Sequence, residues 1–103
     1  MPRNNQNVID SWFRWGMPAR TSTLKTNGDT LFSYDLKIGV TRIDKDGKRV
    51  KFVFDYTKKS GNFRSNTTSK HVGFAEQAGA ILVPPNYQFS PNYKKEFELR
   101  RQQ

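Results

Sequence analysis

Two stretches in the middle of the chain alternate between apolar and polar positions. Their apolar positions recur every second residue: Tyr34, Leu36, Ile38 and Val40, then Val50, Phe52, Phe54 and Tyr56. Successive side chains of a β-strand point to opposite faces, so each stretch is predicted to be a strand with one apolar face. Asp46-Gly47 between them is typical of a tight hairpin turn. The sequence therefore predicts a β-hairpin, with its aromatic residues in the core and its charged residues on the other face.

The first third of the chain is expected to supply two strands. Residues 19–25 are rich in threonine, which favours a strand, and Asn27-Gly28 then marks a second hairpin turn. Residues 30–41 form the next predicted strand, which includes the first alternating stretch. Because this strand is longer than usual, we expect a bend or bulge near Gly39. Residues 1–7 are polar and are expected to be loose.

The last third changes character at residue 67. A short strand is predicted over residues 63–66, followed by a helix over residues 68–78 with a threonine or serine N-cap and Gly79 as its stop. Residues 80–83 are apolar and end at Pro84-Pro85, which predicts a buried or edge strand. Ser90-Pro91 is typical of a helix start and predicts a terminal helix over residues 91–101.

These elements predict the α+β class, with an antiparallel sheet of four or five strands, one short central helix and a C-terminal helix. A chain of 103 residues suits one domain, here residues 1–103. Only 34% of the residues are hydrophobic, but eight Phe, four Tyr and two Trp restore much of the area that a core can bury. The chain has no cysteine, which excludes disulfides and thiolate metal sites.

The N-terminus and the apolar runs bear on where the protein works. No apolar run approaches the roughly 20 residues that cross a bilayer, so no membrane contact is expected. The first residues have no apolar region of a secretory signal. The expected location is the cytoplasm, or the host cytoplasm if the protein is viral.

The charge balance indicates an anionic partner. The formal net charge is +9 and the pI is about 10.1. Ten of the 18 basic residues lie within residues 35–70. Nucleic acid, either DNA or RNA, is the first expectation. The alternatives are an acidic protein surface, or a basic surface that only keeps the protein soluble.

Three groups of residues are candidates for contacts with nucleic acid. Lys37, Arg49 and Lys51 are expected on the polar face of the hairpin, and Lys58 and Lys59 lie in the loop that follows it. The third group surrounds the start of the predicted helix, whose backbone N–H groups favour a phosphate: Arg64, Thr67, Thr68, Ser69 and Lys70. The alternative at the helix start is that a threonine only caps the helix and that His71 is structural.

An aromatic cluster near the N-terminus allows two interpretations. Trp12 and Trp15, with Arg14 between them, could stack on nucleobases. The favoured alternative is that Trp12 covers one end of the core in a helical turn, together with Ile9 and Phe13, because large aromatic side chains are seldom left bare.

Catalytic and cofactor motifs are not found in the sequence. His71 is the only histidine, and without cysteine a zinc site would need carboxylates for its other ligands. Ser69 and His71 stand two residues apart without a nucleophile motif, and there is no Walker-type loop. We therefore expect a protein that is not an enzyme and that uses neither metal nor cofactor.

Residues 65–71, which read SNTTSKH and follow a hairpin rich in Tyr and Phe, resemble a motif in small uncharacterised proteins of phages and other mobile elements. The resemblance covers about residues 31–78. It implies a viral or mobile-element setting and carries no site residues with it.

Together these features predict a small basic protein that binds nucleic acid, mainly through the backbone. The alternative is a phage accessory or structural protein that binds an acidic protein surface, such as an inhibitor of a host defence complex. An exposed sheet edge could also pair two copies into a homo-oligomer.

Overall fold

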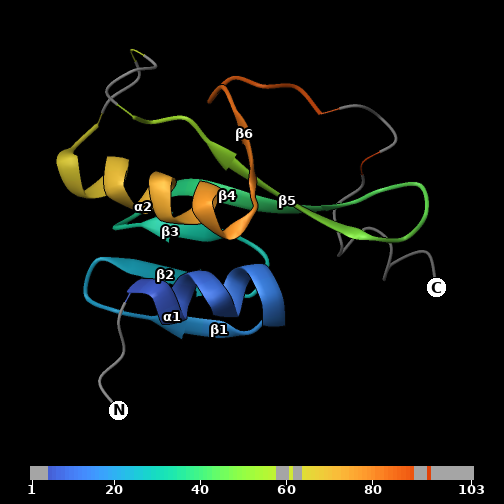
Figure 1. Cartoon of the computed structure of the whole chain (residues 1–103), viewed down its shortest axis with the longest axis horizontal. Helices are drawn as coiled ribbons and strands as arrows, with labels where there is room; N and C mark the ends of the chain where they lie inside the picture. The colour runs from blue at the N-terminus through green and yellow to red at the C-terminus, as the bar shows by residue number, and fades with distance from the viewer. Residues whose placement is uncertain (1–4, 58–60, 62–63, 90–92, 94–103) are drawn as a thin grey trace.

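In the part of the chain that the structure describes, six strands form one mixed sheet that carries two helices on one face, in the α+β class that the sequence predicts (Figure 1). The computed structural model describes residues 5–57, 61, 64–89 and 93. In chain order the elements are α1 (Asn5–Asp10), the π-helical turn η1 (Ser11–Trp15), β1 (Pro18–Arg20), β2 (Leu24–Asn27), β3 (Leu31–Ser33), β4 (Leu36–Ile43), β5 (Arg49–Phe54), α2 (Asn66–Ala78) and β6 (Ile81–Val83).

The strands follow one another across the sheet in chain order. Each of β1 to β4 pairs antiparallel with the next strand, and β6 pairs parallel with β5. A parallel neighbour needs a crossover connection, which α2 provides. The described sheet therefore has six strands where four or five were predicted, and its last pair is parallel. The edge strands are β1 and β6, and pairing of two copies through an edge stays a prediction.

The predicted hairpin is confirmed as β4 and β5. Gly47 in its turn has φ +82°, a conformation that glycine adopts at little cost. The carboxylate of Asp44 accepts hydrogen bonds from the backbone N–H groups of Asp46 and Lys48, both at 2.9 Å. Local side-chain bonding of this kind stabilises a turn within the sequence itself.

Two predicted strands are wrong as continuous elements. The first, over residues 19–25, is divided between β1 and β2, because Thr21 Oγ1 accepts hydrogen bonds from the backbone of Thr23 and Leu24 and reverses the chain. The second, over residues 30–41, is divided between β3 and β4 by a turn at Tyr34, which has φ 56°. A positive φ is uncommon for a residue with a side chain, so the strand propensity of residues 30–41 does not predict this turn.

The irregularity predicted near Gly39 is confirmed as a bulge in β4. Leu31 pairs with Gly39 but Phe32 pairs with Lys37, which leaves Ile38 as an extra residue. Ile38 and Gly39 are both buried. A bulge shifts the alternation by one residue. Side chains before and after it therefore do not keep to the faces expected from the sequence.

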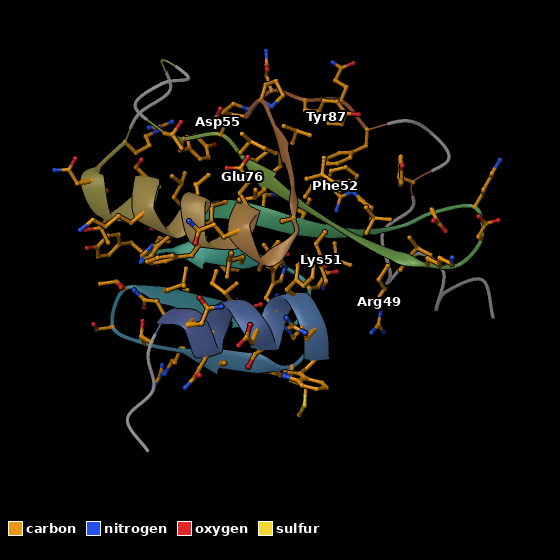
Figure 2. All side chains as sticks on the ribbon, in the orientation of Figure 1. Arg49, Lys51, Phe52, Asp55, Glu76 and Tyr87 are labelled. Atoms are coloured by element: carbon orange, nitrogen blue, oxygen red, sulfur yellow. The ribbon has the colours of Figure 1, made fainter. Side chains whose placement is uncertain are left out.

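Apolar side chains cover both faces of the sheet. The helix-bearing face holds the larger cluster of buried residues: Val8, Ile9, Trp12, Leu24, Leu31, Ile38, Val53, Val72, Ala75 and Ala80. On the opposite face, Phe52, Phe54 and Val40 pack with Val83 of β6 and with the partly buried Phe89. The prediction that Phe52 and Phe54 are core residues is confirmed. Phe52 faces Tyr87, and their ring centroids are 6.4 Å apart (Figure 2).

The central helix and the last strand are confirmed close to their predicted bounds. α2 begins at Asn66, two residues earlier than predicted, and Gly79 with φ +120° ends it. The predicted strand over residues 63–66 is wrong where the structure describes it, since Asn66 is already helical. Residues 5–7 are helical rather than loose. The predicted terminal helix lies outside the described residues, except for Tyr93.

Candidate nucleic-acid interface

Lys51 does not lie on an exposed basic face, which corrects the sequence prediction. It is 8% exposed, and its ammonium group donates a hydrogen bond to Thr41 Oγ1 at 2.6 Å. The same ammonium lies 5.4 Å from the centre of the Trp12 ring, and Thr41 in turn donates to the carbonyl of Asp29 at 2.8 Å. Lys51 is therefore part of the packing between β5 and η1.

The bulge also separates Lys37 from the other predicted hairpin residues. Lys37 pairs with Phe32 on the helix-free face, whereas Thr41 pairs with Lys51 on the helix-bearing face. Arg49 is exposed and lies on the same side of β5 as Lys51 (Figure 2). The expected grouping of Lys37, Arg49 and Lys51 on one surface is therefore wrong, because strand alternation was extrapolated through an irregular position.

The two tryptophans have different environments. Trp12 is fully buried, and its indole N–H donates to the carbonyl of Asp29 at 2.9 Å. Its ring lies edge-on against Phe13. The core interpretation of Trp12 is confirmed, and Trp12 offers no stacking surface. Trp15 is 68% exposed and remains a candidate for stacking on a base.

The start of α2 is capped from within the chain. Ser65 is the N-cap, and its hydroxyl accepts a hydrogen bond from the Thr68 N–H at 3.1 Å. The Thr68 hydroxyl is 2.9 Å from that of Ser33, and Thr68 is 3% exposed, so it does not face a ligand. The other candidates at this helix end lie nearer to solvent: Lys70 and Arg64 are exposed, and Thr67 and Ser69 are partly exposed. Lys58 and Lys59 are outside the described residues.

His71 is a buried structural histidine with uncharged neighbours. Its Nδ1 lies 2.7 Å from Ser33 Oγ, and its Nε2 lies 3.3 Å from Asn5 Nδ2 and 3.4 Å from Thr23 Oγ1. The Asn5 amide donates to Nε2, so the neutral ring carries its proton on Nδ1 and donates it to Ser33. Burial lowers the pKa of His71 from its ordinary value of 6.5, because desolvation disfavours the charged ring.

The structure groups a different set of basic residues. One row crosses the helix-free face of β1 to β4, because Arg20 pairs with Lys25, Lys25 with Phe32, and Phe32 with Lys37. Paired residues point to the same face. The three cations are exposed, and Phe32 between them is partly exposed. We call these four residues the cationic row.

Two surface hollows adjoin the cationic row. The first is an open pocket of about 340 Å³ formed by β1 to β3, with Pro18 and Phe32 among its mainly apolar lining. The second is a more polar hollow of about 570 Å³ that includes the threonine-rich turn between β1 and β2. Arg20 and Lys25 line both hollows. Cationic groups therefore lie between an apolar surface and a polar one.

Sequence reasoning missed three members of this row, namely Arg20, Lys25 and Phe32. Their common face depends on the two turns that divide the predicted strands. The local signal for the first turn was Thr21-Ser22-Thr23, whose hydroxyls compete for backbone hydrogen bonds. Phe32 was counted within one long strand, which concealed its pairing with Lys25 and Lys37.

Within the described ranges, no group of three or more His, Cys, Asp or Glu side chains could hold a metal ion. In the same part of the chain, no helix is both long and apolar enough to cross a membrane.

Comparison with known proteins gave no significant match to a family model, a curated protein or a solved structure.

Proposed function

We propose that this protein binds nucleic acid through the helix-free face of β1 to β4. The observation that supports the proposal is the cationic row, in which the exposed Lys25 and Lys37 flank the partly exposed Phe32 and the exposed Arg20 lies beyond Lys25. Arg and Lys neutralise phosphates and release condensed counterions, which makes such binding favourable at low salt. The net charge of +9 adds long-range attraction for any polyanion.

Lys25 of the cationic row can engage a phosphate although it has an ion-pair partner. Lys25 has one described acidic neighbour, Asp35, at 3.5 Å, and the side chains are 50% and 100% exposed. An exposed ion pair of this kind is worth only about 0 to 1 kcal/mol, so a phosphate can compete for the lysine. The viral or mobile-element setting implied by the sequence resemblance is part of this proposal as its context.

The test compares two pairs of lysines that carry the same charge. The site variant is Lys25→Gln with Lys37→Gln, and the control is Lys45→Gln with Lys48→Gln, both exposed at the β4–β5 turn. Binding of a labelled oligonucleotide is measured across a salt series. We expect wild-type affinity to fall as salt rises, with the slope of log K against log salt reduced by about 0.7 to 0.9 for each lost phosphate contact in the site variant. The control should stay close to wild type.

Equal losses in the two double variants would contradict the proposal, because they would show attraction by net charge alone. Affinity that is insensitive to salt would contradict it as well. A second preparation is purified with and without nuclease and analysed by mass spectrometry. If an acidic protein stays bound after nuclease treatment and no oligonucleotide binds, the basic face is assigned to a protein partner instead.

A further inference from the structure

We infer that the ligand is a single-stranded nucleic acid and that one of its bases stacks on Phe32 in the apolar pocket. This inference rests on the proposed function and adds the strand state and the position of the base. Phe32 lies at the third position of the cationic row, with Lys25 on one side and Lys37 on the other. The Lys25 ammonium is 5.6 Å from the centre of the Phe32 ring.

The pocket beside Phe32 is suited to a flat, weakly polar group. Residues of β1, β2 and β3 form it, and Pro18 and Phe32 contribute to a surface that is mainly apolar. It is open rather than enclosed, so a base can enter from solvent while its sugar stays outside. Bases stack on aromatic side chains whatever their identity, since each has a π face.

The second hollow could bind the sugar and phosphate of the same nucleotide. It is lined by the hydroxyl-rich turn of Thr21, Ser22 and Thr23, and it shares Arg20 and Lys25 with the apolar pocket. Asp35 also lines this hollow, and a phosphate would compete with its carboxylate for Lys25. A base in the apolar pocket would have its phosphate next to two cations and its sugar next to hydroxyl groups. This arrangement matches the division of a nucleotide into an apolar ring and an anionic backbone.

The length of the cationic row matches a short segment of nucleic acid, and access to the Phe32 ring favours a single strand. The cationic row crosses four strands, which span about 14 Å at the usual spacing of about 4.8 Å between neighbours. That length corresponds to about four nucleotides at the 3.4 Å rise of a stacked strand. In a duplex the bases are stacked on each other and would have to be extruded to reach Phe32, whereas a single strand exposes them.

The experiment uses the whole chain and three labelled probes: an oligothymidylate, the same oligonucleotide with central abasic sites, and a hairpin duplex of equal charge. An oligouridylate distinguishes RNA from DNA as the preferred strand. The site variant is Phe32→Leu, which keeps an apolar side chain in β3, and the control is Trp15→Leu at an exposed ring outside the cationic row. Thermal unfolding of each variant checks that the fold is kept.

We expect wild type to bind the oligothymidylate more tightly than the abasic or duplex probe. Phe32→Leu should weaken binding to the oligothymidylate by about 5- to 150-fold, equivalent to about 1 to 3 kcal/mol, and should leave binding to the abasic probe unchanged. Trp15→Leu should have little effect on any probe.

Three results would overturn the inference: a preference for the duplex, equal binding of the intact and abasic probes by wild type, or a loss caused by Trp15→Leu instead of Phe32→Leu. The comparison of intact and abasic probes needs no variant, so it decides even if Phe32→Leu unfolds. If wild type binds all probes with a steep salt dependence but without base preference, this inference fails while the proposed function stands. If no probe binds at low salt, both fail.

Discussion

Adding one methyl group at Gly39 should destabilise the protein, because the space beside this glycine is already filled. A Cβ at Gly39 would lie 2.9 Å from Trp12 Cζ2 and 3.0 Å from Leu31 Cβ. Carbon atoms attract best at about 3.5 to 4.0 Å, so each contact is about 0.5 to 1 Å too short. Both neighbours are fully buried and cannot move aside into solvent.

The size of the effect follows from two opposing terms. Overpacking of a core costs about 1 to 3 kcal/mol. Replacement of glycine by alanine also restricts the unfolded chain, and this loss of entropy raises the free energy of unfolding by about 0.4 to 1 kcal/mol. Gly39→Ala should therefore lower the free energy of unfolding by about 1 to 2 kcal/mol. For a chain of about 100 residues, each kcal/mol corresponds to a Tm decrease of about 4 to 8 °C.

Gly73→Ala provides a matched control with the opposite expected sign. Gly73 lies inside α2, and beyond its own stretch of helix backbone a Cβ there would meet nothing within 4 Å. Alanine in a helix interior is more stable than glycine by about 0.5 to 1 kcal/mol, so this variant should be more stable than wild type. Both free energies are measured by urea unfolding, followed by tryptophan fluorescence and circular dichroism. If Gly39→Ala matched or exceeded wild-type stability, the packing of Trp12 against β4 would be refuted.

Two further predictions concern α2. Acidification below about pH 6.5 should destabilise wild type, because the lowered pKa of His71 means that the unfolded chain binds a proton at a pH where the folded chain does not; the loss in the free energy of unfolding is at most about 1.4 kcal/mol per pH unit. Urea unfolding at several pH values should show a smaller pH dependence of this free energy for His71→Gln. Equal pH dependence in the two proteins would contradict the burial argument. Ser65→Ala should lower the free energy of unfolding by about 1 kcal/mol through loss of the cap to the Thr68 N–H. Ser69→Ala, within the helix, should change it by less than about 0.5 kcal/mol, and a similar loss in both would argue against the cap.

The elements that sequence analysis predicted correctly are those whose signals are local. The β4–β5 hairpin combines alternation with Asp46-Gly47, whose backbone and carboxylate partners lie within five residues. The helix stop at Gly79 is likewise encoded by neighbouring residues, whereas the N-cap is Ser65 and not one of the threonines that follow it. Local hydrogen bonds and backbone preferences do not depend on distant parts of the chain, so a reader of the sequence can find them.

The candidate site was predicted poorly because its geometry depends on strand register. One extra residue at Ile38 places Lys37 on one face of the sheet and Thr41, with its partner Lys51, on the other. A shift of one position reverses which face a side chain occupies, and charge counting along the sequence carries no information about it. The basic character of the chain was visible in the sequence, but the choice of face was not.

The sequence by itself determined a basic α+β protein with a central hairpin, a capped helix and an aromatic core. Tertiary structure decided which cations share a surface, because Arg20, Lys25 and Lys37 become neighbours only when four strands pair in a particular register. It also decided that Lys51 is packed inside, through contacts with Trp12 and Thr41 that lie 39 and 10 residues away along the chain. Composition sets the total charge, whereas the pairing of distant segments sets where that charge meets a ligand.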